Sequence, residues 1–176
     1  MDKEVKHLIE DNIDLIENER FEYLYDKMKM RSLGLIGKFT ETLLNASIDP
    51  ANYLKELPRG YLADTSIQHY DVPETINRLG RYAFANCTEL TSISLPDRLT
   101  FIGISAFMSC YNLSDIVLPE SLIEIESQAF YGCKHLKTIK YLGTVAQWES
   151  IQKGAVVFTR TETVQCRDGN IDLLYK

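Results

Sequence analysis

The sequence predicts an α+β solenoid in which a helical cap precedes a short stack of coils. Three observations predict it: a repeat of fixed period in the middle of the chain, apolar residues at helical spacing before it, and a short segment holding the lone tryptophan after it. We therefore expect three regions, namely a helical cap over residues 1–58, coils over residues 59–145 and a second cap over residues 146–176.

The repeat consists of three segments of equal length, 68–90, 91–113 and 114–136, which align without gaps. In each of them proline, an Ala-Phe pair, cysteine and a closing leucine occupy the same positions. These residues are Pro73, Pro96 and Pro119; Ala83-Phe84, Ala106-Phe107 and Ala129-Phe130; Cys87, Cys110 and Cys133; and Leu90, Leu113 and Leu136. Half-units flank the array, with Tyr61 one period before Phe84, and Ile139 one period after Ile116. One coil cannot bury its own apolar face, so neighbouring coils must stack and share a core.

Each repeated position has a physical role. Apolar residues at Leu90, Ile93 and Leu95 predict a short strand with one buried side. The proline that follows ends the strand because it cannot donate to a ladder. Leu99 and Ile102 are expected to turn the chain back across the core.

Three further positions complete the coil. Gly80 and Gly103 are expected to permit a tight bend, although the third unit has Glu126 at that place. The Ala-Phe pair puts a small residue beside a ring, and the cysteine fills a narrow corner. Successive phenylalanines are therefore expected to stack in a row.

This unit resembles the BspA-type leucine-rich repeat, whose pattern is L-x-x-I-x-L-P-x-x-[LIV]-x-x-I-G-x-x-A-F-x-x-C. The resemblance implies right-handed coils with a parallel sheet of short strands on one face, and a binding scaffold rather than a reaction. The segment 141–151, where Gly143-Thr144 leads to Gln147-Trp148, resembles the segment that closes many such arrays. We therefore expect Trp148 to pack on the last coil. Residues 162–166 are expected to form a final strand, with a turn at Asp168-Gly169.

The segment 1–58 predicts three helices and a short fourth. Asp49-Pro50 is a typical helix start, with Asp49 as N-cap, and the short helix is expected to carry Leu54 and Leu57 and to end at Pro58. These helices should cover the first coil. The residues expected on their inward faces are Val5, Leu8, Ile9, Ile13 and Ile16; Phe21, Leu24, Tyr25 and Met28; and Leu35, Ile36, Phe39 and Leu43.

The leader, residues 1–19, is acidic, because it holds seven carboxylates and two lysines. The acids that we single out are Glu10, Asp11, Asp14 and Glu17. One interpretation is a solvated helix face. The other is an acidic surface that imitates nucleic acid and occupies a basic cleft on a partner.

The composition excludes several classes of partner. A net charge of -6 without any basic run disfavours direct binding to nucleic acid or anionic lipid. No segment approaches the roughly 20 apolar residues of a membrane-spanning helix, and charges stand where a signal peptide is apolar. We therefore expect a cytoplasmic protein with reduced cysteines.

Residues that could support chemistry are scattered. The repeat cysteines stand one full period apart and should stack as a ladder, and no Cys-x-x-Cys or paired histidine supports a metal site. His7, His69 and His135 fall in different parts of the chain, and there is no phosphate-binding loop. The sequence thus predicts no catalytic site, no metal and no cofactor.

The candidate binding surface is the solvent-facing side of the strands. Neighbouring strands lie about 4.8 Å apart, so two columns of side chains should run across a continuous sheet. It is either an ordinary solvated surface or a rigid recognition surface that loses little entropy on binding. Its residues, called the repeat face below, are His69, Asp71, Ser92, Ser94, Asp115, Val117, Thr138 and Lys140.

The predicted function is protein binding by a monomer or weak dimer, through the repeat face, the acidic leader or both. A narrower hypothesis starts from the resemblance of small versions with a helical leader to phage-encoded proteins. In that case the partner is a host defence protein, and the chain is an anti-CRISPR-like inhibitor in the host cytoplasm. The alternative is a structural or adhesive protein that self-associates through the solenoid edge.

Overall fold

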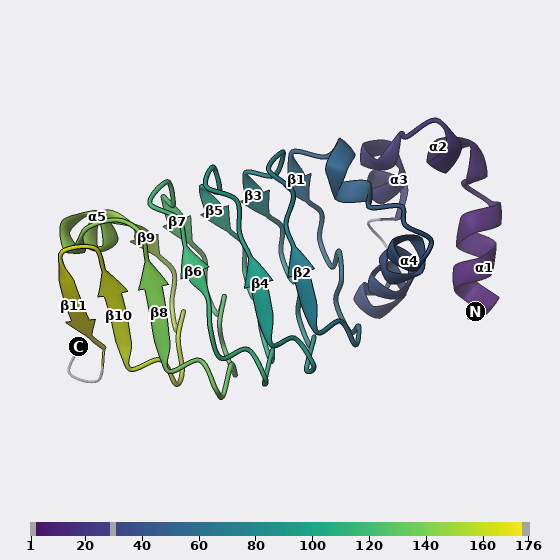
Figure 1. The fold of residues 1–176 in the computed structure, drawn as a ribbon. Coiled ribbons are helices and arrows are strands. Elements are labelled where there is room, and N and C mark those ends of the chain that lie inside the picture. The colour runs from purple at the N-terminus through teal and green to yellow at the C-terminus, as the bar shows by residue number, and fades with distance from the viewer. Residues whose placement is uncertain (1–2, 29–30, 174–176) are drawn as a thin grey trace.

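A computed structural model describes residues 3–28 and 31–173 as an elongated solenoid with helices at its N-terminal end (Figure 1). The two ends of the chain lie at opposite ends of the molecule, with the coils stacked between them. The predicted fold class is confirmed.

Over the described residues 3–28 and 31–58, the N-terminal cap holds four α-helices and a 3-10 turn: α1 (Lys3–Glu10), α2 (Ile13–Glu17), α3 (Phe21–Met28), α4 (Leu33–Asn45) and η1 (Pro50–Tyr53). Asp49 caps η1 as expected, because its side chain accepts a hydrogen bond from the Ala51 amide at 2.9 Å. Three expectations were wrong. The first predicted helix, with Val5 to Ile16 on one face, is divided into α1 and α2. Leu57 lies in a strand rather than in the short helix, and Ile13 is 46% exposed instead of facing inward.

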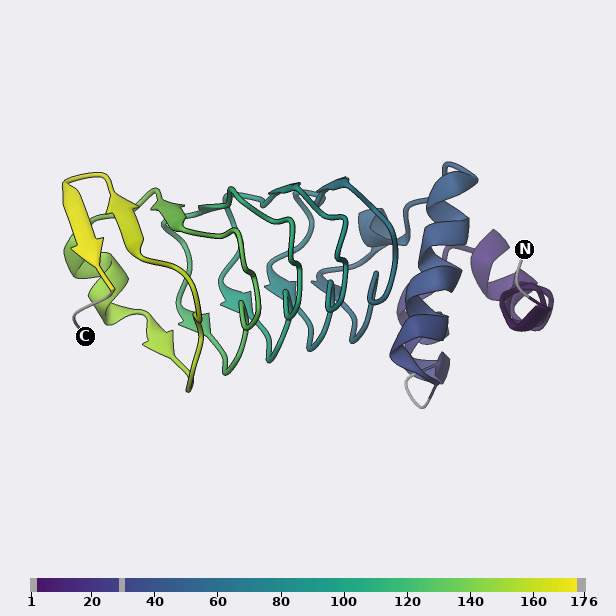
Figure 2. The same ribbon diagram turned by 90° about the horizontal axis from the view of Figure 1, so that it is seen from below.

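Helix α4 lies across the end of the coils (Figure 2). At Gly37 the helix approaches the first coil so closely that no side chain would fit between them. A Cβ atom there would lie 1.9 Å from the carbonyl oxygen of Ala63. Glycine at this position therefore lets the helix cover the apolar end of the array.

Each coil contributes to two sheets, of which the sequence predicted one. The second is parallel and consists of β1 (Glu56–Leu57), β3 (Arg78–Leu79), β5 (Phe101–Ile102), β7 (Glu124–Ile125) and β9 (Gln152–Lys153). Ile102, expected only to turn the chain, is a buried strand residue. Such short strands hold too few positions for an alternating pattern, so no periodicity in the sequence indicates them.

The predicted sheet on the repeat face is interrupted. It consists of β2 (His69–Asp71) with β4 (Ser92–Ser94), and separately of β6 (Val117–Leu118), β8 (Thr138–Tyr141), β10 (Thr163–Cys166) and β11 (Gly169–Asp172). No ladder joins β4 to β6 within the described residues. Asp115 lies in the segment before β6 and not in a strand. The expectation of one continuous sheet was therefore wrong.

The core is a row of stacked rings, as predicted. The ring centroids of Phe84 and Phe107 lie 5.3 Å apart, and those of Phe107 and Phe130 5.1 Å apart, with interplanar angles of 3° and 7°. Phe158 continues the row at 5.5 Å from Phe130. All four rings belong to the shared interior of the coils.

The cysteines do more than fill a corner. The Sγ atoms of Cys87, Cys110 and Cys133 donate hydrogen bonds of 3.0, 3.1 and 3.1 Å to backbone carbonyl oxygens of the preceding coil. A small side chain with a weak donor thus satisfies a buried carbonyl at the same place in each coil.

The first coil is one position shorter than the period predicts. Glu56 pairs with Arg78, whereas the repeat would bring it opposite Leu79. The Leu62 amide donates to the next coil as the Phe84 amide does, so Leu62 rather than Tyr61 takes the phenylalanine place. A half-unit with few matching positions could not reveal this shift.

The bend glycines act by close approach. Cβ atoms at Gly80 and Gly103 would lie 2.4 and 2.8 Å from carbonyl oxygens of the preceding coil. The left-handed backbone of the bend occurs instead at Tyr82, Ser105 and Gln128, with φ angles of 59°, 54° and 60°. The expected role of the glycines in bending was therefore wrong.

The C-terminal end closes on helix α5 (Val145–Ser150), which carries Trp148. As predicted, Trp148 is buried on the last coil, with its ring 5.3 Å from that of Tyr141 and 6.1 Å from that of Phe158. Strand β10 is the expected final strand, and β11 pairs with it in antiparallel fashion. Strands β1 and β9 to β11 lie in the ranges assigned to the caps, so the sheets extend beyond residues 59–145.

Candidate binding surface

The repeat face presents its side chains in register on neighbouring coils. His69 pairs with Ser92, Asp71 with Ser94, and Val117 with Lys140. All eight predicted residues are exposed or half-buried. The structure therefore places seven of them in the two parts of the sheet, whereas Asp115 lies just before β6.

The columns continue past the residues that the sequence identified. Thr163 pairs with Thr138, and Gln165 with Lys140. Asn170 and Asp172 of β11 then extend the two columns by one more strand. The last coil is longer than the repeat unit, so the repeat period does not predict these additional residues. The alternation of polar and apolar residues around Val164 is the sequence pattern that could have indicated them.

A packed interior supports this surface. The residues behind the exposed columns, Tyr70, Ile93, Ile116 and Ile139, are at most 7% exposed. Close-packed interiors leave side chains and strands little freedom to move. The outward side chains therefore stand on a rigid support.

A hydrogen-bonded chain of three side chains lies on β2 and β4. His69 Nδ1 is 2.8 Å from Ser92 Oγ, and His69 Nε2 is 2.9 Å from Asp71 Oδ1. Hydrogen bonds from Ser94 and His69 lower the pKa of Asp71.

Ser92, His69 and Asp71 have the residue types of a nucleophile, a base and an orienting acid, but these side chains lie at the solvent-exposed surface. The side chains of His69 and Asp71 are 51% and 73% exposed. An activated nucleophile depends on an environment in which charge is stabilised and water is excluded. The arrangement fixes the orientation of a polar surface, which suits recognition.

A hollow of about 390 Å³ lies at the C-terminal end of the repeat face; we call it the carboxyl-end hollow. It is lined by Lys140, Tyr141, Leu142, Gln165, Cys166, Arg167 and Asn170. A second hollow of about 270 Å³ shares Leu142 and Arg167 with it and is otherwise lined by Asp97, Pro119 and Glu120.

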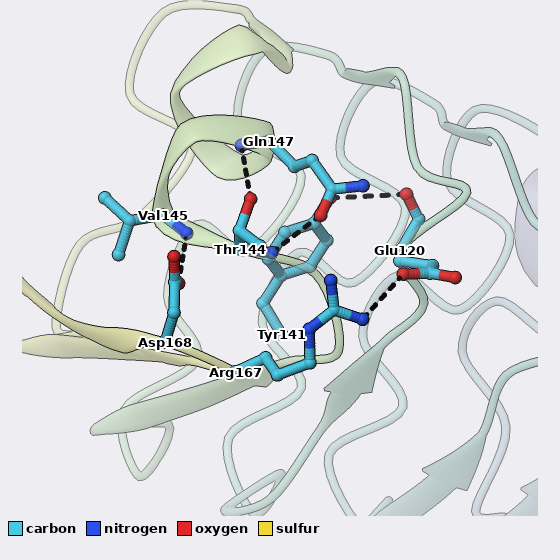
Figure 3. A network of polar contacts seen from close by, with 7 residues as sticks. All are labelled: Glu120, Tyr141, Thr144, Val145, Gln147, Arg167 and Asp168. Atoms are coloured by element: carbon cyan, nitrogen blue, oxygen red, sulfur yellow. Dashed lines mark hydrogen bonds and ion pairs between the residues drawn. The ribbon is translucent and has the colours of Figure 1, made fainter.

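Polar contacts hold the residues around this hollow in place (Figure 3). Arg167 Nη1 lies 3.4 Å from Glu120 Oε2, and the Arg167 amide donates to the Gly143 carbonyl at 2.9 Å. The Tyr141 hydroxyl donates to the Glu120 carbonyl at 3.3 Å. The Asp168 carboxylate accepts from the Val145 amide at 2.8 Å, which ties the β10–β11 turn to α5.

The junction of the cap with the coils holds a larger hollow, about 490 Å³. Its lining carries both charges: Glu22, Asp26 and Glu56 with Lys55, Arg59 and Arg78, besides Tyr25, Leu54, Pro58 and Asn77. Arg78 pairs with Glu56 at 3.4 Å, and its guanidinium lies 3.6 Å from the centroid of the Phe101 ring. Arg78 thus has two partners, and the three acids of the lining balance its three cations.

The four leader acids singled out from the sequence, Glu10, Asp11, Asp14 and Glu17, are exposed. Glu10 pairs with Lys6 at 3.6 Å. Asp11 lies between α1 and α2, while Asp14 and Glu17 belong to α2. Binding by the acidic leader stays a hypothesis.

The cysteine thiols are not activated. All four are free. Burial raises the pKa of Cys87 to about 11 and that of Cys133 to about 12, and burial together with Asp168 raises the pKa of Cys166. Thiols of raised pKa are poor nucleophiles at neutral pH.

Residues 3–28 and 31–173 lack two other kinds of feature. No three His, Cys, Asp or Glu side chains gather there in a way that could hold a metal ion. None of the helices in these ranges is long and apolar enough to cross a bilayer.

The family model of the BspA type leucine rich repeat region matches residues 55–173, in six copies. The chain belongs to this family. BspA-type chains carry leucine-rich repeats, and leucine-rich-repeat proteins in general mediate protein interaction or adhesion. They are not typically enzymes.

Solved structures resemble this BspA-type chain over part of its length. A leucine rich cell surface protein of Faecalibacterium prausnitzii is 24% identical, with a TM-score of 0.49 over 57% of this chain and 33% of its own. A leucine-rich repeat protein of Bacteroides ovatus is 20% identical, with a TM-score of 0.40 over 66% and 42%. The chain thus spans less than half the length of either. No curated protein matches it.

Proposed function

We propose that this chain is a protein-interaction module that binds a protein partner through the repeat face. The observation that supports the proposal is the register of the exposed side chains, which repeat from coil to coil over a fully packed interior. Ordering a flexible surface opposes binding, and a surface that is already ordered avoids this cost.

The proposed partner is a protein, with no narrower identity. The comparisons do not support the narrower hypothesis of a phage inhibitor of host defence. The cytoplasmic location stays a prediction.

The test is site-specific photo-crosslinking in extracts of the cells from which the chain comes. The photoreactive amino acid benzoylphenylalanine replaces Ser94 on the repeat face or, as the matched control, Tyr131, which is 44% exposed and lies outside that face. We expect a crosslinked partner from position 94 only, and unmodified protein added in excess should suppress it. Crosslinking of one partner at position 131 alone would contradict the proposal.

Self-association is the competing outcome. A product of twice the mass of the chain, together with a size-exclusion volume that depends on concentration, would favour the structural or adhesive alternative.

A further inference from the structure

We propose that the carboxyl-end hollow binds a carboxylate side chain of the partner protein together with a neighbouring apolar side chain. The inference rests on the proposed function, because Lys140, Gln165 and Asn170 belong both to the columns of the repeat face and to the lining of the hollow.

The charge of the lining differs from that of the chain. The chain has 25 acidic and 19 basic residues. The lining of the carboxyl-end hollow includes Lys140 and Arg167 and no acid. The junction hollow, by contrast, has three acids against three cations. The lining itself is positive, although Glu120 of the adjoining hollow pairs with Arg167, and a positive lining on a negative protein favours an anionic group by charge complementarity.

Both cations are available to a ligand. Arg167 and Glu120 form an ion pair at 3.4 Å, but their side chains are 62% and 57% exposed. Such pairs contribute little, so an incoming carboxylate can take the place of Glu120. Within residues 3–28 and 31–173 the Lys140 ammonium has neither an ion pair nor a hydrogen bond.

The apolar part of the lining is fixed. Leu142 is 38% exposed and lines both hollows. The Tyr141 hydroxyl donates to the Glu120 carbonyl, which fixes the ring (Figure 3). Gly143 leaves room for the ring, because a Cβ atom there would lie 2.6 Å from it. An aliphatic or aromatic side chain next to the carboxylate would cover Leu142.

The side-chain amides complete the site. Gln165 and Asn170 lie opposite each other in the β10–β11 ladder, and each carries an N–H donor for a carboxylate oxygen. The volume of about 390 Å³ suits one or two side chains rather than a whole domain. A protein carboxylate fits better than a polyanion, since a net charge of -6 repels nucleic acid over longer distances.

The test uses the whole chain and a random peptide library displayed on phage. We expect selected peptides to be enriched in Asp or Glu next to Leu, Ile, Phe or Tyr, relative to the unselected library. The best synthetic peptide is then measured by fluorescence polarisation. Lys140→Gln with Arg167→Gln should weaken its binding about tenfold or more, as should added salt, and Leu142→Ala should weaken it less.

The matched control is Lys134→Gln with Arg160→Gln, which removes the same charge at two exposed residues outside both hollows. Its affinity should be unchanged, and urea unfolding checks that all variants are folded. Selected peptides without acidic enrichment, or equal binding by the two double variants, would overturn the proposal. Peptides whose affinity depends on Asp71 but not on the residues of the hollow would overturn this inference and leave the proposed function standing. Peptides whose affinity changes neither with the variants of the hollow nor with substitution of the other repeat-face residues would overturn both.

Discussion

The centre and the two ends of the solenoid bury their aromatic rings in different ways. In the centre each ring meets an identical ring, so that Phe107 lies nearly parallel to both neighbours, at 3° and 7°. At the N-terminal end the Tyr61 and Tyr70 rings are tilted by 55°, and at the C-terminal end Trp148 meets Tyr141 at 61°. Repetition suffices where neighbours are alike, whereas each end requires residues that occur once.

The polar contacts differ in the same way. In the centre a cysteine donates to a carbonyl of the preceding coil, once per repeat. At the N-terminal end one carboxylate, Asp49, accepts from the hydroxyls of Tyr61 at 2.6 Å and Tyr70 at 3.0 Å. That carboxylate joins the cap to the first coils.

The largest expected effect comes from breaking the central row. Phe107→Ala removes a fully buried ring that has a ring on each side, and should lower the free energy of unfolding by about 3–5 kcal/mol. Tyr131→Ala, at a residue 44% exposed, should cost less than about 1 kcal/mol. Urea denaturation measures both, and equal losses would show that the row does not hold the coils together.

The cap is tested by a pair of glycines on α4. Gly37→Ala places a Cβ atom 1.9 Å from a backbone oxygen and should cost about 1–3 kcal/mol through overpacking. At Gly34 the nearest atom is a side-chain oxygen of Asp64 at 3.1 Å, so Gly34→Ala should be neutral or slightly stabilising, because alanine favours helix. Hydrogen exchange of α4 amides reports undocking. A neutral Gly37→Ala would contradict the close approach of helix and coil.

The tyrosines of the N-terminal end predict a loss of stability at alkaline pH. Burial, with the Asp49 carboxylate as a further cause, raises the pKa of Tyr70 above its ordinary value of 10.0, and burial raises that of Tyr61. The folded state keeps these phenols protonated while the unfolded state loses their protons above about pH 10. Their contribution to stability is thus complete below that pH and declines above it. Urea denaturation at pH 8 and pH 11 should show the decline, and Tyr70→Phe should reduce it; a Tyr70→Phe profile identical to that of the wild type would be inconsistent with this origin.

The smallest effect is a difference in thiol reactivity. Cys87, Cys110 and Cys133 are buried in the coils, whereas Cys166 is only partly covered at the C-terminal end. An aromatic disulfide reagent should modify Cys166 slowly in the native protein, because its thiol is partly accessible although its pKa is raised, and the other three only after unfolding. Cys166→Ser should abolish the native reaction, and rapid native reaction of the remaining three would contradict the packing of the column.

The centre could be predicted from the sequence because identical residues recur at a fixed spacing. The row of Phe84, Phe107 and Phe130 followed from that spacing alone. Asp49 as a helix cap and Trp148 as a closing residue followed from local patterns.

The structure of the two ends differs from the prediction where the spacing between equivalent residues of neighbouring coils changes. The first coil is one position short, which displaced Tyr61 from the expected column. Phe130 pairs with Phe158, although the period points to Lys153, and this longer spacing hid the last ring. The carboxyl-end hollow could not be predicted, because Leu142 and Arg167 are adjacent only after the longer last coil has folded back. No local pattern records that approach.

The central claim is that the interior specifies the fold and leaves the repeat face free for recognition. It is tested most directly by the free energy of unfolding of one variant in which His69, Asp71, Ser94, Val117 and Lys140 are all changed to threonine. The account predicts a change within about 1 kcal/mol, because these side chains are exposed and threonine suits a strand. A loss as large as that expected for Phe107→Ala would contradict it.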